Sequence, residues 1–499
     1  MNQRFKSNEV EEFAFDHLSS IETGGLLSRR ELMRRATLFG AAGTLGTFTG
    51  ILHAAGPEAA GKVTVGLDSG AFTPILKTFA PEFQKATGID LTFASYPLGN
   101  MYDQNLLALR QKTARFDAFD FWPNFVGDFG PYLTPLEEVG TKAELGFDDI
   151  APPFQLLNHY EGKLVGVTID GDMFMNTYRT DLFEDAAEAK AFKVKYGYDL
   201  GAPRDYKQYR DTAEFFTRPD KNLYGAVEVT SYFVYAFFIN HLVQAAVEKG
   251  QSRYGELFDA DMKPQLLTDV AEEALRRYGE MTAFMPKNLA KAMPWDVGRQ
   301  MFFEGKIAQA NWWTDMPKGA ADPSISKVAG KIKCAGNWGG VTVLPYGRAM
   351  GIAKNSQNKK GAFKAIAWMQ QTANANRWVA ETFSQSLMDP WRMSMFNNPK
   401  ATFPLQAASG FADNFATVSK DLLTSKKAYL DLSIPGTNRY LSSIIQHVQR
   451  ANSGEATPRQ ALQAMTTEFE ETTKAYGRDR QIKHNAEYRQ RMIKQGYWS

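Results

Sequence analysis

The pattern of apolar and polar positions after residue 60 predicts strands and helices that alternate along the chain. Residues 62–67 alternate with a period of two, as a half-buried strand does. An amphipathic helix is expected at 75–83. Two more strands are expected at 89–94 and 117–121, with a helix at 103–110 between them. Strands that alternate with helices in this way predict a parallel sheet with right-handed crossovers.

The predicted sheet also indicates where a ligand would bind. In parallel sheets, ligands sit beyond the carboxyl ends of the strands. Here those ends are followed by residues 68–70, 95–96 and 122–124, and we expect these three short segments to lie near one another.

A later stretch combines two strand-like segments with a charged break. Residues 164–169 and 173–178 are apolar and β-branched, and Asp170, Gly171 and Asp172 separate them. This pattern is typical of a chain that crosses between two lobes. It is equally typical of an ordinary surface turn between two strands, and the local pattern leaves both interpretations open.

Beyond this stretch the pattern is mostly helical. Thr180 can cap a helix that starts near Asp181. Strands are expected at 224–229, 307–311, 341–344 and 350–354. Helices are expected at 205–216, 231–248, 268–282, 296–303, 359–383, 440–452, 458–476 and 478–494, the last one solvated. Since no linker divides the chain, two lobes joined by several crossings fit better than two separate domains.

The N-terminal sixty residues do not resemble folded structure. They contain Arg29 and Arg30, followed by Glu, Leu and Met, then an uncharged run at 36–52 and small residues at 54–56. This order is typical of a cleavable export signal, and the arginine pair resembles the twin-arginine signal. The alternative is a basic amphipathic helix, which four glycines in the uncharged run disfavour.

Composition and charge exclude several classes of function. The 499 residues are 44% hydrophobic and carry a net charge of +2, so no large field points to nucleic acid or a membrane surface. Cys334 is the only cysteine, and no two of the six histidines have the spacing of metal ligands. No phosphate-binding glycine motif follows a predicted strand. We therefore expect no metal and no cofactor.

The remaining chemistry is aromatic. Trp122, Trp312, Trp313 and Trp338 each fall where a predicted strand meets a loop. An indole face can stack on the C–H face of a sugar, while nearby polar groups bind its hydroxyls. Each tryptophan alone fits core packing better, but four at such junctions predict that at least two face a cleft.

Several segments in order resemble extracellular solute-binding proteins of ABC importers, in the group of maltose- and other sugar-binding proteins. The resemblance covers about residues 61–477. It rests on 62–70, 117–122 with 132–136, 162–167 with 175–183, 303–308 with 312–313, 337–340, 362–369 and 453–462.

This resemblance implies an α/β fold of two lobes joined by hinge strands, with the ligand between them. Residues 61–168 plus about 345–395 would form lobe 1, and 169–344 plus about 396–499 lobe 2. The implied ligand-binding residues are Asp68, Ser69, Trp122, Asn124, Asp170, Asp172, Tyr232, Trp312, Trp313, Trp338 and Gly339, with Trp391, Arg392 and Asn438 as further candidates. Many relatives carry proline in the crossover, where this chain has Thr168, Ile169 and Asp170.

The function that follows from the resemblance is transport. We expect a monomeric periplasmic protein that captures a sugar or polyol by hinge closure and delivers it to the membrane permease of an ABC importer. Nucleic acid is not an expected partner. Because Asp170 and Asp172 could also act as an acid–base pair, the alternative is an exported carbohydrate-active enzyme.

Overall fold

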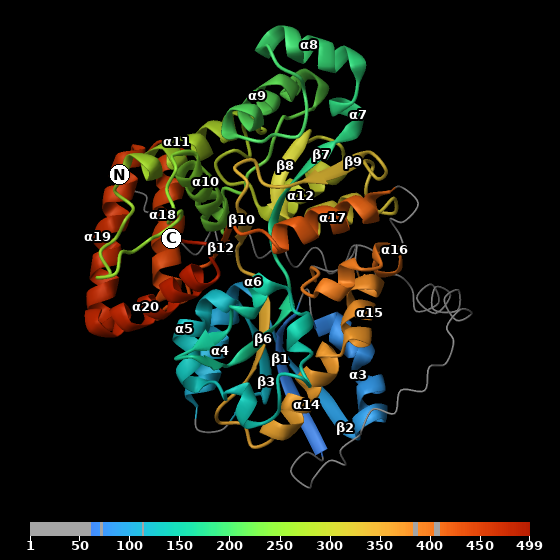
Figure 1. Ribbon diagram of the computed structural model, residues 1–499, viewed down its shortest axis with the longest axis vertical. Helices are drawn as coiled ribbons and strands as arrows, with labels where there is room; N and C mark the ends of the chain where they lie inside the picture. The colour runs from blue at the N-terminus through green and yellow to red at the C-terminus, as the bar shows by residue number, and fades with distance from the viewer. Residues whose placement is uncertain (1–60, 70–72, 112–113, 383–387, 404–409) are drawn as a thin grey trace, which may run out of the picture. The chain divides into compact units, whose positions relative to one another are not determined.

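The computed structural model describes residues 61–499, except for 70–72, 112–113, 383–387 and 404–409 (Figure 1). The expected export signal at 1–60 therefore lies outside the described residues. Within the described part, no helix has both the length and the apolar character that a membrane crossing requires.

A five-stranded sheet forms around the first strands of the described chain, which are blue to cyan in Figure 1, and it also contains β11, which is orange. β1 is parallel to β2 and to β3, as the sequence pattern predicts. β11 lies antiparallel between β3 and β6, although it follows β3 by more than 200 residues. The strands in spatial order are β2 (Ile89–Tyr96), β1 (Gly61–Asp68), β3 (Ala118–Phe121), β11 (Arg348–Ile352) and β6 (Gly166–Asp170).

Amphipathic helices pack against this sheet. α3 (Thr73–Thr87) contacts β2 and buries Leu76, Phe79 and Phe83, all on the side that the sequence predicts to be apolar. α4 contacts β3, and α14 contacts β1. The bounds of these two helices are Met101–Arg110 and Lys359–Gln370.

A second, three-stranded sheet is antiparallel throughout. Its order is β8 (Gln309–Trp313), β7 (Phe174–Arg179) and β9 (Ile332–Ala335). Next to it, α10 (Val234–Glu248) is buried over almost its whole length, because it is apolar on every side. α17 (Phe411–Leu423) packs on β9.

The chain crosses from one sheet to the other at the charged break. β6 ends at Asp170 in the five-stranded sheet, and β7 begins at Phe174 in the three-stranded one. Asp170 is only 3% exposed. The interpretation as a crossing is therefore confirmed, and the alternative of a surface turn is wrong.

The remaining elements are mostly helical. The short strands are β4 (His159–Tyr160), β5 (Lys163–Leu164), β10 (Thr342–Leu344) and β12 (Ala428–Leu430). The helices are α5 (Val126–Phe129), α6 (Pro152–Gln155), α7 (Thr180–Phe183), α8 (Ala186–Tyr196), α9 (Tyr206–Phe216), α11 (Asp269–Met281), α12 (Trp295–Phe303), α13 (Asp315–Ala320), α15 (Thr372–Thr382), α16 (Pro399–Thr402), α18 (Thr437–Ser453), α19 (Pro458–Tyr476) and α20 (Arg478–Lys494). The 3₁₀ turns are η3 (Leu98–Asn100), η4 (Pro123–Phe125), η5 (Gly130–Tyr132), η6 (Leu136–Glu138), η7 (Phe147–Asp149), η8 (Pro219–Lys221), η9 (Thr282–Phe284) and η10 (Met393–Phe396).

Three local predictions are wrong. The segment 224–229 is not a strand, since only Tyr224 forms a single bridge, to Ile307. The helix expected at 359–383 is broken at Gln371, whose ψ of 129° is not helical. Thr180 does not cap α7 with its side chain, because the helix already includes it.

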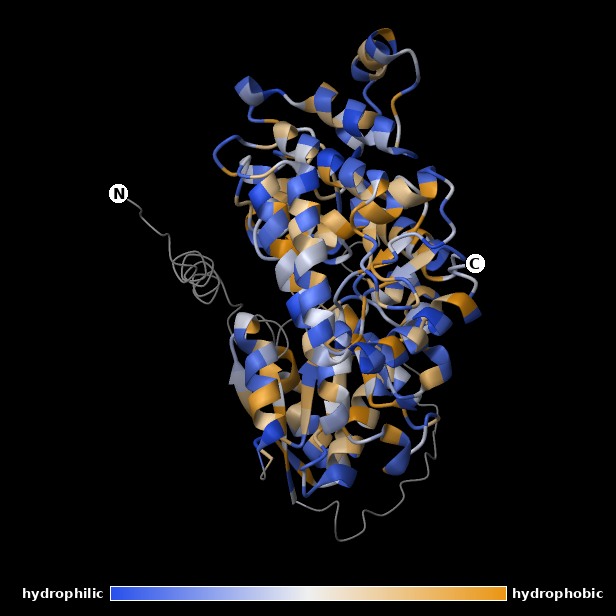
Figure 2. Cartoon of the chain, turned by 90° about the vertical axis from the view of Figure 1, so that its left-hand side faces the viewer, coloured by the Kyte–Doolittle hydropathy of each residue, from blue (hydrophilic) through white to orange (hydrophobic). Residues whose placement is uncertain are grey.

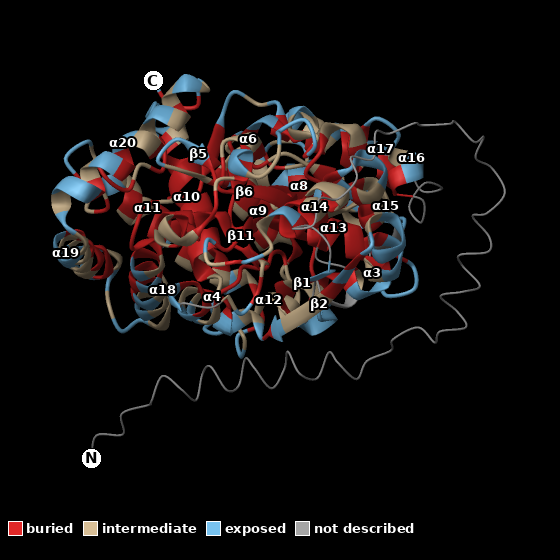
Figure 3. Ribbon diagram, turned by 90° about the horizontal axis from the view of Figure 1, so that it is seen from below, coloured by how far each residue is buried: buried red, intermediate tan, exposed pale blue. Residues whose placement is uncertain are grey.

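The C-terminal helices are more buried than expected. α20 inserts Gln481, His484, Asn485, Tyr488 and Met492 into the interior, so it is not simply a solvated helix. Figure 2 shows hydrophobic and hydrophilic positions interleaved along the helices, and Figure 3 shows the buried residues gathered inside the exposed faces of the outer helices. One hydrophobic cluster includes side chains from both sheets.

Candidate functional site

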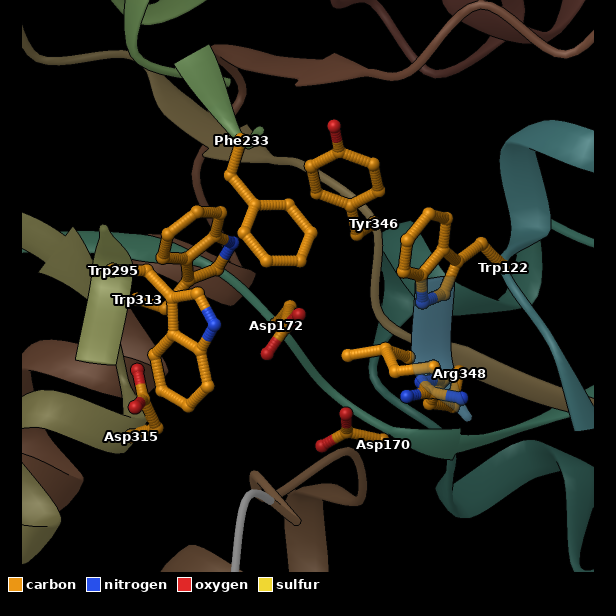
Figure 4. Close-up of a pocket in the computed structure, with 10 residues that line it drawn as sticks. Trp122, Asp170, Asp172, Phe233, Trp295, Trp313, Asp315, Tyr346 and Arg348 are labelled. Carbon is orange, nitrogen blue, oxygen red and sulfur yellow. The ribbon is translucent and has the colours of Figure 1, made fainter. Parts of the chain in front are cut away.

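A pocket lies where the crossing segments pass between the two sheets (Figure 4). Its cavity volume is about 520 Å³, including solvent at the mouth. Because this volume includes open solvent, the enclosed part of the pocket is smaller. The lining residues are Leu98, Trp122, Asp170, Asp172, Phe233, Trp295, Trp313, Asp315, Tyr346 and Arg348.

Arg348 forms the basic side of the pocket. It is the first residue of β11, and the sheet pairing places it beside Asp170 of β6. Its guanidinium lies 3.3 Å from a carboxylate oxygen of Asp68 and is also paired with Asp120. The same guanidinium lies over the Trp122 ring, 5.8 Å from the centroid. Two carboxylates at the ends of β1 and β3 therefore hold the cation in place.

The interior behind Arg348 carries an excess of negative charge. Tyr96 donates its hydroxyl to Asp120 at 2.8 Å, and the Asn105 amide donates to the backbone carbonyl of the same residue. Burial raises the pKa of Asp120 to about 7; the positive charge of Arg348 opposes this rise, and the negative charge of Asp68 adds to it. The guanidinium thus compensates only part of the electrostatic cost of burying these acids.

The crossing segment contributes two carboxylates. Asp170 accepts a hydrogen bond from the backbone N–H of Asp389, and Asp172 accepts one from the backbone N–H of Gly347 at 3.1 Å. Burial, followed by repulsion from Asp389, raises the pKa of Asp170. Burial, followed by repulsion from Asp170, Asp389 and Asp315, raises the pKa of Asp172.

Gly171 is required between these carboxylates for steric reasons. A Cβ atom at this position would lie 2.2 Å from the carbonyl oxygen of Pro390. The Gly171 N–H donates to the carbonyl of Asp389 at 3.0 Å. The crossing segment and residues 389–390 are therefore in direct backbone contact.

A second group of charges supports the opposite side of the pocket. Lys318 of α13 is fully buried and lies 2.5 Å from Asp389, which also accepts a hydrogen bond from Thr314. Asp315 begins α13 and is 3.0 Å from Arg299 of α12. Burial raises the pKa of Asp315 to about 6; the positive charge of Arg299 opposes this rise, and the negative charge of Asp389 adds to it.

Aromatic rings form the rest of the pocket wall. Trp122 and Tyr346 lie with their ring centroids 4.7 Å apart, and Phe233 contacts both. Trp313 packs edge-on against Phe233 at 5.7 Å and donates its indole N–H to the carbonyl of Pro345. Figure 4 shows Trp295 beside Trp313 and Asp172 between these rings and Arg348.

Four of the residues predicted from sequence line this pocket: Trp122, Asp170, Asp172 and Trp313. Three others lie at its edge. Asp68 pairs with Arg348. Tyr232 is 45% exposed, and its ring centroid is 6.5 Å from that of Trp122. The Asn124 amide donates a hydrogen bond to Asp431 at 3.2 Å. Ser69 is exposed beyond β1, and its backbone N–H bonds to Tyr96.

The structure places two of the predicted tryptophans in the interior instead of the pocket. Trp312 has no exposed surface; it packs against Phe237 and contacts Trp313 edge-on, with the two ring centroids 6.0 Å apart. Trp338 is also fully buried and stacks on Tyr209 at 5.9 Å. Gly339 lies so close to Gln244 that a Cβ atom there would be 2.3 Å from its side-chain oxygen.

The further candidates also serve structure. The Trp391 indole donates to Gln370 at 3.2 Å. Arg392 has no exposed surface and donates to the carbonyls of Leu145 and Gly146. Asn438 lies in the first turn of α18, where its carbonyl accepts from a serine hydroxyl one turn later.

Sequence reasoning missed six lining residues: Leu98, Phe233, Trp295, Asp315, Tyr346 and Arg348. For Asp315 a signal existed, because it follows Trp313 by two positions. For Arg348 there was none, because its position depends on the pairing of β11 between two distant strands.

One acidic group has the geometry of a cation site. Oxygen atoms of Asp170, Asp172 and Asp389 lie within 4.8 Å of one another. However, the Asp389 carboxylate already binds Lys318 and Thr314. A metal ion here would have to compete with a buried ammonium group, so the donor set does not fit a dedicated metal centre.

Comparisons with known proteins agree with this geometry. A family model described as bacterial extracellular solute-binding protein matches residues 69–376. A probable amino-acid ABC transporter periplasmic-binding protein of Sinorhizobium fredii is 22% identical over 320 residues, which cover 62% of this chain and 68% of that relative.

Solved structures of similar fold include a solute-binding protein of Agrobacterium radiobacter K84 in complex with ribitol. It has a TM-score of 0.68 and 22% identity, and the match covers 83% of this chain and 100% of that chain. A second, from Agrobacterium vitis S4 with bound D-mannitol, has a TM-score of 0.66 and 19% identity, with coverage of 84% and 99%. At these identities the matches establish the two-domain fold.

Proposed function

Because the chain belongs to the family of bacterial extracellular solute-binding proteins, we propose that it captures a sugar or polyol and delivers it to the permease of an ABC importer. The observation that carries this proposal is the pocket between the sheets, where aromatic rings face carboxylates and a guanidinium. Rings cover the apolar face of such a ligand, and the charged groups bind its hydroxyls.

Two relatives support the ligand class. The proteins from Agrobacterium radiobacter and Agrobacterium vitis hold ribitol and D-mannitol, which are acyclic polyols. The Sinorhizobium relative is named for amino acids. An amino acid needs a cation for its carboxylate, and among the described lining residues Arg348 is the one cation. Since Arg348 already pairs with Asp68 and Asp120, a polyol is the better fit.

The mechanism is hinge closure. We take the lobes as the resemblance implies, 61–168 plus about 345–395 for lobe 1 and 169–344 plus about 396–499 for lobe 2, except that Ile169 and Asp170 stay with β6 in the sheet of lobe 1. A ligand that contacts both lobes binds the closed state more tightly and shifts the population toward it. The crossing at Gly171, Asp172 and Met173 is the natural hinge, because these three residues join β6 to β7 and so connect the two sheets.

A thermal-shift screen against sugars, polyols and amino acids tests this function. A ligand at 100 times its dissociation constant adds roughly 2.7 kcal/mol of stability. For about 440 folded residues this corresponds to a rise of about 3 °C in Tm. X-ray scattering should show compaction with the same ligand, and absence of both responses to every sugar and polyol would contradict the proposal.

The alternative, an exported carbohydrate-active enzyme, predicts a different result with the same compounds. Incubation of oligosaccharides with substoichiometric protein would yield products if the protein were an enzyme. A binding protein gives stoichiometric binding without turnover. Product formation that disappears in Asp170→Asn would favour the enzyme.

Export by the twin-arginine route is the proposal for residues 1–60. Replacing Arg29 and Arg30 by Lys should leave the precursor in the cytoplasm, because lysine lacks the planar fork of the guanidinium. Cell fractionation measures the distribution. Normal periplasmic yield of the double variant would exclude this route. Light scattering of the exported protein tests the expected monomeric state.

A further inference from the structure

The pocket contains more acidic than basic side chains. Among its described lining residues, Asp170, Asp172 and Asp315 are acidic and Arg348 is basic. The guanidinium of Arg348 is already shared by Asp68 and Asp120.

The neighbouring cations do not correct this imbalance. Lys318 pairs with Asp389 and Arg299 pairs with Asp315. Within the described residues, Asp170 and Asp172 have only backbone N–H donors as hydrogen-bond partners. The connected network therefore holds six carboxylates and three cations, Arg348, Lys318 and Arg299. A neutral ligand would leave this imbalance in place, whereas a cationic ligand would reduce it.

The aromatic side chains of the same pocket are also suited to a cation. Trp122, Phe233, Trp295, Trp313 and Tyr346 surround the space above the carboxylates (Figure 4). The faces of these rings carry partial negative charge, and tryptophan attracts an ammonium group most strongly. This is an independent feature, because the rings come from different elements than Asp170 and Asp172.

We propose that the ligand carries an ammonium group, as in an amino sugar or an amino-substituted polyol, and that this group lies between Asp170, Asp172 and Asp315. The inference rests on the proposed function, since it assigns the charge of the ligand in the same pocket. The carbon chain or ring of the ligand contacts Trp313 and Trp122, and its hydroxyls reach the guanidinium and the remaining carboxylate oxygens.

The protonation states of the pocket support this assignment. Burial and mutual repulsion raise the pKa values of Asp170 and Asp172. The groups that act on them are Asp389, Lys318, Arg348 and Asp315, from the segments on either side of the crossing. An ammonium group would stabilise the ionised carboxylates, so its binding should release protons to the buffer. Affinity should fall as the pH is lowered, because protons then compete with the cation.

A metal ion explains the pocket less well. It would use Asp389, which Lys318 already neutralises. It would also make no use of the aromatic wall. An organic cation uses both the carboxylates and the rings.

Isothermal titration calorimetry on the purified full chain, with matched ligand pairs, tests the proposal. The pairs are 1-amino-1-deoxysorbitol against sorbitol, and glucosamine against glucose, with N-acetylglucosamine as a neutral control. At pH 7.5 we expect at least one amine to bind about tenfold more tightly than its hydroxyl counterpart, a difference of about 1.4 kcal/mol. Titrations in two buffers of different ionisation heat should show proton release.

Variants assign the effect to the pocket. Asp172→Asn should weaken amine binding about tenfold or more and affect the neutral counterpart less. Asp199→Asn is the matched control, since Asp199 is exposed and pairs with Lys193 on the surface. It should bind like the parent protein.

The outcomes separate this inference from the proposed function. Equal or tighter binding of a neutral sugar or polyol would overturn the ammonium assignment and leave the sugar and polyol function intact. Binding of putrescine with no binding of any sugar or polyol would uphold the positive charge and overturn the proposed function. Stabilisation by CaCl₂ alone, or no response to any of these compounds, would overturn the inference.

Discussion

Trp312 and Trp313 are adjacent in β8, but the structure predicts opposite effects when each is replaced by alanine. Trp312 has no exposed surface and packs against Phe237. Its removal should cost about 3–5 kcal/mol of unfolding free energy, as for other buried aromatic side chains. With an unfolding entropy of roughly 0.9 kcal/mol/K for about 440 residues, Tm should fall by about 3–5 °C. Affinity for ligand should stay within about threefold of the parent value.

Trp313→Ala should act mainly on binding. This ring lines the pocket, and a buried aromatic contact of this kind contributes about 2–4 kcal/mol to binding. That corresponds to a loss of about 30- to 700-fold in affinity. Some stability should also be lost, because the ring packs against Phe174 at 4.9 Å. The diagnostic quantity is therefore the change in affinity relative to the change in Tm.

Calorimetry and thermal unfolding of the two variants, with the best ligand from the screen, give both quantities. Trp312→Phe is the matched control, since within the described residues the Trp312 indole N–H has no hydrogen-bond partner to lose. It should fold and bind nearly normally. If Trp312→Ala weakens binding as much as Trp313→Ala does, the burial of Trp312 outside the pocket does not separate the roles of the two rings, and the assignment of the pocket is refuted.

Three further variants test the charges and the crossing segment. Arg348→Met should lower the free energy of unfolding by about 3–5 kcal/mol, as measured by denaturant unfolding, because it removes the buried cation that pairs with the Asp68 and Asp120 carboxylates. Gly171→Ala should lower Tm, because its Cβ would lie 2.2 Å from the Pro390 carbonyl, whereas Gly201→Ala, with no atom within 4 Å, should not. Asp172→Asn should raise the Tm of the unliganded protein at pH 8. The pKa of Asp172 is raised in the folded protein, so at this pH the carboxyl group is more easily ionised in the unfolded chain, which destabilises the fold, and asparagine cannot ionise. Unfolding scans at several pH values should show this gain in Tm shrinking as the pH falls towards the ordinary aspartate pKa of about 4. There the parent carboxyl group is protonated in both the folded and the unfolded state. A gain in Tm that does not depend on pH would contradict the reasoning.

The periodic pattern was sufficient to predict most elements near the pocket. It predicted β1, β2 and β3 and the helices between them, because each has a local pattern of period two or 3.6. It failed at 224–229, where apolar residues suit a strand but no partner strand lies alongside. It also failed at Gln371, where no proline or glycine marks the break between α14 and α15.

The pocket itself was only partly predictable, for two physical reasons. β8 continues two residues further than its pattern indicates, so Trp312 and Trp313 fall inside the strand, where Trp313 lines the pocket and Trp312 is fully buried. Asp170 meets Asp389 across 219 positions of sequence. Contacts of that kind depend on how β6 and β11 pair, and no local pattern encodes them.

The distribution of the carboxylates also bears on how binding would drive closure. Asp170 ends a strand of the five-stranded sheet, whereas Asp315 follows β8 of the three-stranded sheet. Burial raises the pKa values of both acids, so without ligand their ionisation favours an open, more solvated arrangement. A ligand can shift this equilibrium only by its different affinity for the two states. An ammonium group between Asp170 and Asp315 has that difference, because it binds both carboxylates only when the sheets approach, and it then stabilises their ionised forms.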